Sequence, residues 1–509
     1  MKGRSPFKIS LSPHDRNTYP YHGEGDTGGE VNKQSQVKVA LPKGRLLAQT
    51  AARLRKAGWG VIGYHEKARL YRIKSRSFPH LSAKVFHERD IPIQVAIGNY
   101  DLGICGSDWI EELLTKYPSS ALVKVGNLQY GEGALYVAAS RSGGISTLEE
   151  VRAKPDIIRI ASEYPNLAEF FALNLRLRRF SIFPLWGAAE VYPPESADLA
   201  LVSGTTEELL YYGLMPVSKI LSVSAFLIAN KNSWEAKDMG EVVTSVCDKA
   251  MAQEQHPALD TVTKLETTGQ RLPKYETCSE EVVRFALPDG HQQLPTLRLL
   301  TKANIGIHDY PSATGNRRPK TDLPGVTIKV IRPQDMPLQV ANGNFDLAIT
   351  GRDWLMEHLY QFPSSPVTEL LDLKLGRVKI VAVVSKDLPV ADVHSLRRLN
   401  AERVVPLRVA SEYTNIADKY ARDNHLGLYR VVPTWGASEA FLPEDADLLI
   451  ENTRTGRTIA RHNLKVIDTL FESTACLIGN TKRVSSSIKQ ERIKSIIETL
   501  RMAAEEIIF

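Results

Sequence analysis

Two short stretches at opposite ends of the chain carry residue types that bind phosphate groups. Residues 451–458 read Glu-Asn-Thr-Arg-Thr-Gly-Arg-Thr, an acid followed by hydroxyls, a glycine and arginines. Residues 41–46 read Leu-Pro-Lys-Gly-Arg-Leu, with Lys43 and Arg45 on either side of a glycine. A glycine-containing loop between a strand and a helix presents backbone N–H groups to a phosphate, and nearby cations hold polyphosphates. The pattern predicts a site for a phosphorylated ligand.

Each stretch has a partial copy elsewhere in the chain. Residues 283–294 repeat residues 37–46, but Asp289 and His291 stand in the places of Lys43 and Arg45. Residues 197–214 repeat residues 446–464, but are one residue shorter and lack the acid and the second glycine-threonine pair. Because the two copies have lost complementary halves of one pattern, we expect a single composite site per chain.

Further matches in the same order establish a duplication. Asp90-Ile-Pro and the run from Gly98 to Trp109 match Asp335-Met-Pro and the run from Gly343 to Trp354, with an offset of 245 for the tryptophans (354 − 109). Ala-Ser-Glu-Tyr at 161–164 recurs at 410–413, and Trp-Gly-Ala-Ala-Glu at 186–190 recurs as Trp-Gly-Ala-Ser-Glu at 435–439. The small drift in offset indicates short insertions in surface loops.

Composition limits the function classes. The 509 residues carry a formal net charge of +6, but basic and acidic residues are interleaved, without a basic stripe for nucleic acid. The four cysteines show no paired spacing, so a disulfide framework or zinc site is not expected. No apolar run approaches the roughly 18 residues of a membrane span, and residues 1–36 lack a signal-peptide core. We therefore expect a cytoplasmic protein without membrane or nucleic-acid partners.

Strands and helices are expected to alternate, which favours parallel-rich sheets covered by helices. In the first copy, strands are predicted near 37–41, 84–86, 93–96, 101–104, 134–139, 157–161, 182–185, 190–192, 198–202 and 225–229. Helices are predicted over 46–57, from an N-cap at Ser162 to Leu175, and near 241–253; the second copy is expected to end in a helix over 487–506.

This alternation predicts two α/β lobes in each repeat. Residues 1–36 are expected to form a disordered tail, residues 37–255 the first repeat, residues 256–281 a linker and residues 282–509 the second repeat. In the first repeat, lobe I is expected at about 37–140 and 225–255, and lobe II at about 141–224. In the second, lobe I is expected at about 282–388 and 475–509, and lobe II at about 389–474.

The ordered set of motifs resembles one enzyme family. Leu-Pro-Lys-Gly-Arg-Leu, Asp-Ile-Pro, the Asp-Leu-Gly-Ile block, Ser-x-Tyr, Gly-x-x-Glu and Thr-Gly-x-Thr make both halves similar to the short-form catalytic chain of ATP phosphoribosyltransferase. The resemblance implies an α/β fold of two lobes around a cleft, similar to periplasmic binding proteins and here duplicated in tandem. It also implies transfer of the phosphoribosyl group of phosphoribosyl pyrophosphate to N1 of ATP, the first step of histidine biosynthesis.

The resemblance assigns roles to individual residues. Binding of the 5-phosphate is expected from Thr453, Thr455, Gly456, Arg457 and Thr458, and binding of the ribose hydroxyls from Glu451; Asn452 and Arg454 complete the loop. Cations near the pyrophosphate are expected to be Lys43, Arg45, Arg69, Arg89 and Arg332. Contacts to the nucleotide or ribose are expected from Ser162, Tyr164, Glu190, Ser411, Tyr413 and Glu439.

Structural roles for several of these residues stay open. An exposed salt bridge explains Arg69, Arg89 and Arg332 as well as leaving-group binding does, and a solvated surface pair is the alternative for Lys43 and Arg45. Helix capping and burial explain Ser162, Ser411 and the two tyrosines; Asp108 and Asp353 suit helix caps, and Trp186 and Trp435 suit packing. The loop at Ser203–Thr206 is not expected to hold phosphate.

Cofactor and partners follow from the resemblance. Mg²⁺ is expected on the substrate pyrophosphate, without a metal site of the protein's own, and a regulatory subunit resembling histidyl-tRNA synthetase is a candidate partner. The duplicated chain is expected to form a pseudo-dimer that oligomerises further. Two alternatives stay open: an inactive paralogue acting as a regulatory subunit, and a two-lobed small-ligand-binding module.

Overall fold

The computed structural model describes residues 36–65, 71–247, 263–264, 281–482 and 486–506. The expected N-terminal tail up to residue 35, Arg69, most of the linker and the end of the helix expected at 241–253 lie outside the described residues. The described residues of 36–509 belong to one compact unit.

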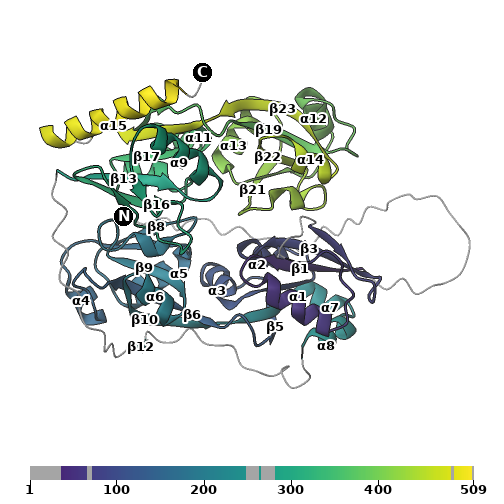
Figure 1. The fold of residues 1–509 in the computed structure, drawn as a ribbon. Coiled ribbons are helices and arrows are strands. Elements are labelled where there is room, and N and C mark those ends of the chain that lie inside the picture. Colours follow the sequence, from purple (N-terminus) through teal and green to yellow (C-terminus); the bar gives the residue numbers. More distant parts are fainter. Residues whose placement is uncertain (1–35, 66–70, 248–262, 265–280, 483–485, 507–509) are drawn as a thin grey trace, which may run out of the picture. The chain divides into compact units, whose positions relative to one another are not determined.

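The first repeat contains two mixed sheets flanked by helices (Figure 1). The strand order of its first sheet is β2-β3-β1-β4-β11-β5, with β1 parallel to β3 and β4. The bounds are β1 Val37–Lys43, α1 Leu47–Lys56, β2 Arg72–Lys74, β3 Leu81–His87, α2 Ile91–Ala96, β4 Leu102–Gly106, α3 Ser107–Lys116, β5 Leu122–Asn127, β11 Ala225–Asn230, α7 Lys231–Ala236 and α8 Gly240–Val246.

The second sheet has the order β12-β10-β6-β9-β7-β8. Its elements are β6 Gly133–Ser140, α4 Leu148–Ala153, β7 Ile158–Ser162, α5 Pro165–Asn174, β8 Phe180–Pro184, η2 Ala189–Val191, β9 Leu199–Gly204, α6 Thr206–Tyr211, β10 Leu214–Val223 and β12 Thr263–Lys264. The chain thus passes from the first sheet to the second after β5 and returns between β10 and β11.

The second repeat reproduces this arrangement. Its sheets have the orders β16-β13-β17-β24-β18 and β21-β20-β22-β19-β23, beside a small β14-β15 hairpin. The first sheet and its helices comprise β13 Val283–Pro288, α9 Gln293–Lys302, β14 Ile307–His308, β15 Lys320–Thr321, β16 Val326–Ile331, α10 Met336–Ala341, β17 Leu347–Gly351, α11 Arg352–Gln361, β18 Val367–Asp372, β24 Ala475–Asn480 and α15 Ser487–Glu505. The second comprises β19 Val378–Ser385, α12 Val393–Ala401, β20 Leu407–Ser411, α13 Thr414–Asp423, β21 Tyr429–Pro433, η5 Ser438–Phe441, β22 Leu448–Thr453, α14 Arg457–Arg461 and β23 Leu464–Ser473.

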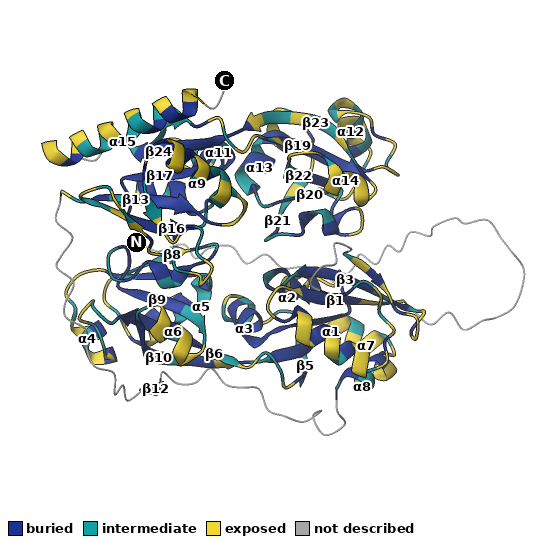
Figure 2. Cartoon of the chain, viewed as in Figure 1, coloured by how far each residue is buried: buried dark blue, intermediate teal, exposed yellow. Residues whose placement is uncertain are grey.

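The central strands are buried on both faces, as covered parallel-rich sheets require. Every residue of β4 and β17 is buried, and Figure 2 shows the sheets as mostly buried between partly exposed helices. None of the helices in the described ranges combines the length and apolar content needed to cross a membrane. The expected α/β class and tandem duplication are confirmed.

The two repeats pack with opposite lobes in contact. One apolar cluster joins Phe86, Ile91 and Phe226 of the first repeat's first lobe to Phe441 and Leu449 of the second repeat's second lobe. A second cluster makes the reciprocal contact, between the first repeat's second lobe and the second repeat's first lobe. Each element of this interface therefore occurs twice, as in an isologous dimer.

Ion pairs repeat with the same symmetry. The buried Lys84 Nζ lies 2.8 Å from Glu444 Oε2 and 2.8 Å from Asp445 Oδ2. Its counterpart Lys329 lies 2.8 Å from Glu195 Oε2. Although burial alone would raise them, the pairs with lysine and arginine lower the pKa of Glu195 and of Glu444 to about 2.

Two strand predictions were wrong. Residues 93–96 belong to helix α2, which begins beside Pro92, a residue suited to the first helical turn. Residues 190–192 fall in and directly after the 3₁₀ turn η2, which follows a left-handed residue at Ala188. In addition, β6 and β19 pair with strands of the second sheet of their repeats. The chain therefore crosses from the first sheet to the second before residue 133 in the first repeat and before residue 378 in the second.

Acid should weaken the contact between the repeats. The folded-state pKa of Glu195 and Glu444, about 2, lies below the roughly 4.3 of an unfolded glutamate. Stability from these pairs is therefore complete above about pH 4.3 and is lost as the pH falls toward 2. We expect the urea concentration at the midpoint of unfolding to decrease when the pH is lowered from 5 to 3.

The double substitution Glu195→Gln with Glu444→Gln should lower the midpoint at pH 5 and shrink the further fall at pH 3. Replacing the exposed Glu169 and Glu402 by glutamine serves as the matched control, which should retain the full acid dependence. Equal acid dependence in both double variants would contradict this assignment.

Candidate active site

The hydroxyl-rich loop at residues 452–458 joins β22 to α14 and borders a cavity of about 340 Å³, called here the second cleft. Gly456 N donates to Thr453 Oγ1 at 3.0 Å, which folds the loop back on itself. Gly456 has a φ of 69°, a left-handed conformation that favours glycine, and no side chain caps α14. The lining residues are Tyr71, Glu412, Ala437, Ser438, Glu439, Glu451, Asn452, Thr453, Arg454, Thr455, Arg457, Thr458 and Ile459.

Three carboxylates face this loop. Glu451 Oε1 accepts a hydrogen bond from Asn452 N at 2.9 Å. Burial and the neighbouring charge of Glu439 raise the pKa of Glu412 to about 7, and burial with the charges of Glu412 and Glu439 raises the pKa of Glu451 well above its ordinary value. The charged forms of these two glutamates are therefore disfavoured in the empty cleft, and a positive charge beside them would make them easier to ionise.

The first repeat supplies one wall of the second cleft. Tyr71 lines the cavity, and its ring stacks on that of His462 with centroids 4.9 Å apart. Lys43 Nζ lies 5.5 Å from the centroid of Tyr71, and its charge acts on Glu412 of the second repeat. The geometry brings Lys43 and the loop at 452–458 to one region of the chain.

Arg89 lies between two tryptophans. Its guanidinium carbon is 5.4 Å from the ring centroid of Trp109 and 4.2 Å from that of Trp435, which belongs to the other repeat. Such contacts hold a guanidinium through the negative faces of the rings. Arg89 also lines a cavity of about 460 Å³ that it shares with Glu412, so it lies beside the second cleft.

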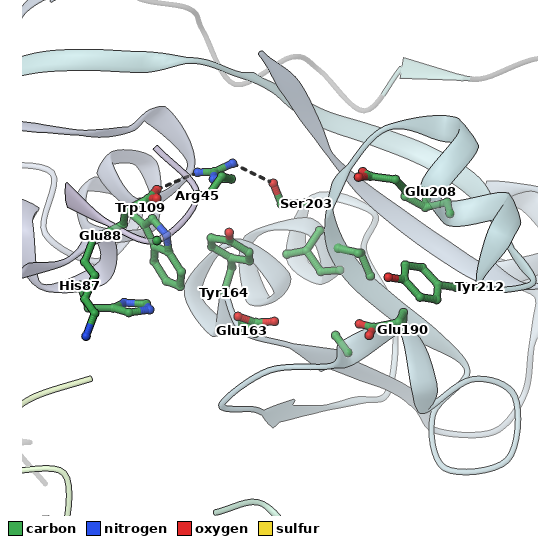
Figure 3. A pocket seen from close by; sticks show the side chains of 16 residues that line it. Arg45, His87, Glu88, Trp109, Glu163, Tyr164, Glu190, Ser203, Glu208 and Tyr212 are labelled. Carbon is green, nitrogen blue, oxygen red and sulfur yellow. Dashed lines mark hydrogen bonds and ion pairs between the residues drawn. The ribbon is translucent and has the colours of Figure 1, made fainter. Parts of the chain in front are cut away.

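The equivalent cavity of the first repeat, called here the first cleft, has a volume of about 360 Å³ (Figure 3). Lys43, Arg45, His87, Glu163, Tyr164, Glu190 and Ser203 are among the residues that line it. Figure 3 shows Arg45 between Glu88 and Ser203, with Nη2 3.0 Å from Glu88 Oε2 and Nη1 3.4 Å from Ser203 Oγ. Arg45 Nη2 also lies 3.0 Å from Asp108 Oδ2, so two buried carboxylates hold this guanidinium.

Two serines that were expected near the nucleotide have their hydroxyls buried below the clefts' surface. Ser162 and Ser411 are fully buried, and each hydroxyl accepts from the backbone N of the tyrosine two residues later. Neither serine caps α5 or α13, whose N-caps are Tyr164 and Tyr413, so the N-cap prediction for Ser162 was wrong.

The paired tyrosines and aspartates form one cluster in each repeat. Tyr164 donates to Asp108 at 2.8 Å, and Tyr413 donates to Asp353 at 2.6 Å. The aspartates make no side-chain cap for α3 or α11, which corrects the alternative of helix capping. Asn452 Nδ2 lies 2.9 Å from Tyr413 Oη, which ties the hydroxyl-rich loop to this cluster.

Arg332 lies on the side of the first cleft. Its Nη1 is 3.2 Å from Asp289 Oδ2, and its Nε packs against Gly187, where an added Cβ would lie 2.8 Å from Nε. The backbone N of Asp289 donates a hydrogen bond to Ile331 O. Arg332 is thus paired with an acid, and its charge acts on His87 together with those of Lys43 and Arg89.

Four residues near the clefts escaped the sequence analysis. Glu163 and Glu412 occupy the same place in the two Ser-Glu-Tyr runs, a recurrence that could have identified them. Tyr71 and His87 carry no such signal, because their counterparts are Arg317 and Arg332. Burial and the charges of Arg89, Lys43 and Arg332 lower the pKa of His87 to about 4, so its ring is neutral near pH 7.

A loop of hydroxyls and arginines facing carboxylates and a lysine, in a duplicated two-lobed α/β chain, suits a transferase acting on a phosphorylated sugar. The family model described as HisG: ATP phosphoribosyltransferase matches residues 87–249 and 332–502. The chain belongs to the ATP phosphoribosyltransferase family, and the two matched segments correspond to the two repeats.

Individual relatives agree with this assignment. ATP phosphoribosyltransferase of Chlorobaculum parvum is 30% identical over 230 residues, covering 44% of this chain and 72% of the relative. The enzyme of Saccharolobus solfataricus is 32% identical over 230 residues, covering 43% and 72%.

Solved structures include the ATP phosphoribosyl transferase (HisG:HisZ) complex from Thermotoga maritima. It is 20% identical, with a TM-score of 0.36, covering 44% of this chain and 100% of that chain. The effector-binding domain of QuiR in complex with shikimate is 13% identical, with a TM-score of 0.27, covering 44% and 97%.

Arg45 should contribute more to stability than to substrate binding. Replacing it with methionine leaves Glu88 and Asp108 without their cation, at a cost of about 2 kcal/mol of unfolding free energy, since the guanidinium is partly exposed. Urea unfolding measures the difference. Arg55→Met on the exposed side of α1 is the control and should change stability by less than about 0.5 kcal/mol. Equal stability of the two variants would contradict the role given to Arg45.

Proposed function

We propose that the chain performs the ATP phosphoribosyltransferase reaction at one composite site, the second cleft completed by the first repeat. In this reaction the bond from C1 of the sugar to the pyrophosphate breaks as N1 of ATP bonds to C1, and pyrophosphate leaves. It is the first step of histidine biosynthesis. The observation that carries the proposal is Tyr71, which lines the cavity of the other repeat's loop beside Lys43.

We assign the loop at 452–458 to the 5-phosphate. Its hydroxyls, backbone N–H groups and arginines offer several donors to one phosphate, and the left-handed Gly456 shapes the turn. Glu451, whose carboxylate lies at the start of the loop, is assigned to the ribose hydroxyls. Glu439 lines the same cavity and is assigned to the ribose or the adenine.

Charge separation during the reaction calls for groups of both signs. Positive charge builds on the sugar as the bond to pyrophosphate lengthens, and we assign the ionised form of Glu412 to stabilise it. Negative charge builds on the leaving group, which we assign to Lys43 and Arg89. Tyr164, Glu190 and Arg332 line or border the first cleft, and Arg45 is held by acids; we give them no direct role in the second.

Mg²⁺ bound to the substrate is proposed to shield the pyrophosphate. Among the described residues, no three His, Cys, Asp or Glu side chains are placed to hold a metal, so the substrate phosphates would supply most ligands. A cytoplasmic location and a regulatory subunit resembling histidyl-tRNA synthetase also stay proposals. Activity of the purified chain alone, with ATP, phosphoribosyl pyrophosphate and Mg²⁺, tests whether such a subunit is required.

Both repeats should be needed for catalysis at one site. Lys43→Ala and Gly456→Val should each lower kcat/KM by about 100-fold, because one removes a cation and the other distorts the loop. The absorbance of phosphoribosyl-ATP follows product formation. Absence of product from the native chain would instead favour the regulatory-subunit alternative.

Matched controls come from the same chain. Lys38→Ala removes an exposed lysine from the same strand, and Gly213→Val strains another left-handed glycine in open space; both should retain activity. The shared site is excluded if only one of the two site variants loses activity.

Activity should rise with pH through neutrality. The raised pKa of Glu412, about 7, means that its carboxylate becomes charged as the pH increases from 6 to 8. Since the charged form stabilises the sugar cation, kcat/KM should increase over this range, with an apparent pKa that belongs to the coupled glutamates together. Glu412→Gln should remove the increase, whereas Glu163→Gln, whose group has a pKa of about 7 in the first cleft, should leave it in place. Loss of the increase in both variants, or in neither, would refute this role.

A further inference from the structure

The first cleft differs from the second in how its cations are balanced. Asp289 replaces Lys43, and its buried carboxylate lies 2.9 Å from Arg317 Nη1 and 3.2 Å from Arg332 Nη1. Arg317 Nε is also 3.6 Å from Glu190 Oε1 of the first repeat. The two arginines at this corner are therefore neutralised by carboxylates of the chain itself.

The equivalent corner of the second cleft is arranged in the opposite way. Tyr71 occupies the position that Arg317 has in the other repeat. The backbone oxygen of Tyr71 accepts a hydrogen bond from Val85 N at 2.8 Å, and that of Arg317 accepts one from the equivalent Val330 N at 2.9 Å. Lys43 takes the place of Asp289; it lines the first cleft, its charge also acts on Glu412 of the second, and no ion pair joins it to any acid in the described ranges. Its charge remains for a ligand.

The loops differ in the same sense. In the first repeat, Glu208 stands where Thr458 stands in the second, and its Oε2 accepts from Thr205 N at 2.8 Å. This carboxylate lies over the loop, since a Cβ on Gly204 would be 2.7 Å from the same oxygen. Val202 stands where the second repeat has Glu451. The first loop thus holds a carboxylate of its own and lacks the ribose acid.

Arg332 retains unused donor capacity. Its Nε is buried without a hydrogen-bond partner in the described part of the chain, while Asp289 engages only Nη1. Because this Nε is packed against Gly187, a second anionic oxygen would be bound by the more exposed terminal nitrogens of Arg332, one of which Asp289 engages. Asp289 therefore holds a position that a larger anion could fill, but its own charge repels that anion.

We propose that Asp289 and Glu208 are built-in carboxylates that occupy the anion positions of the first cleft, so that one chain binds one phosphoribosyl pyrophosphate. The proposal rests on the function proposed above for the ligand of the second cleft. These two carboxylates lie at the positions of a sugar phosphate and a pyrophosphate. They exclude both ligand groups by electrostatic repulsion and by occupying the hydrogen-bond donors that would bind them. The first repeat then serves the second cleft through Tyr71, Lys43 and Arg89.

Titration calorimetry of the native chain with phosphoribosyl pyrophosphate measures the number of sites. The expected stoichiometry is one per chain, and two would overturn the proposal. Thr458→Glu places in the second loop the carboxylate that the first loop has, and should weaken binding by more than 100-fold. Thr458→Gln, of the same size without the charge, should weaken it by about 10-fold; equal losses in both variants would show that charge is not the cause.

A second arm tests Asp289 directly. In the Thr458→Glu background, adding Asp289→Asn frees Arg317 and Arg332, and one equivalent of inorganic pyrophosphate should bind with at least 10-fold higher affinity than in the background alone. Asp322→Asn, which removes an exposed aspartate paired with His308, is the matched control and should leave pyrophosphate binding unchanged. No gain with Asp289→Asn overturns the proposal. A native chain that binds no phosphoribosyl pyrophosphate at all would instead refute the proposed function.

Discussion

The contact of each lobe with the opposite lobe of the other repeat is the constraint on which the site depends. Apolar side chains such as Phe86 and Phe441, with ring centroids 5.2 Å apart, would face water in an isolated repeat. The buried Lys84 and Lys329 would also lose their acidic partners, and an unpaired buried charge is strongly destabilising. The same contact brings Tyr71 and Lys43 to the second repeat's loop. Stability and site assembly therefore come from one interface.

A symmetric interface offers two composite clefts, and substitutions at equivalent positions separate their properties. Tyr71 corresponds to Arg317, Lys43 to Asp289 and Arg89 to Gln334, while Glu451 corresponds to Val202. Each substitution changes charge or hydrogen bonding at the cleft, and at Tyr71 it also changes an apolar contact with the interface cluster. When both copies share one polypeptide, a single composite site would need each motif only once. The backbone can then keep its symmetry while the side chains of the two clefts differ.

The repeat and most strand and helix positions were predictable because buried strands and amphipathic helices leave periodic patterns that recur in both copies. The strand prediction for residues 93–96 was wrong because a short apolar run has the same composition in a strand and in a helix. Pro92, which suits the first turn of a helix, is the residue that favours the helix. The hydroxyl-rich loop was recognised from its residue types alone. The pairing of Arg45 with Glu88 and Asp108, and the arrival of Tyr71 from the other repeat, depend on contacts between distant segments, which spacing along the chain does not reveal.

The charges that line the two clefts bear on the proposal that the second cleft, rather than the first, carries this chemistry. In the first cleft, burial raises the pKa of Glu163 and of Glu190, and the charges of Arg317 and Arg332 offset part of this effect. In the second cleft, burial and the charge of Glu439 raise the pKa of Glu412 and of Glu451, which also act on each other. A sugar that gains positive charge in the transition state relieves this repulsion, whereas a neutral ground-state sugar does not. At the proposed site, this difference would favour the transition state over the substrate, which is the condition for catalysis.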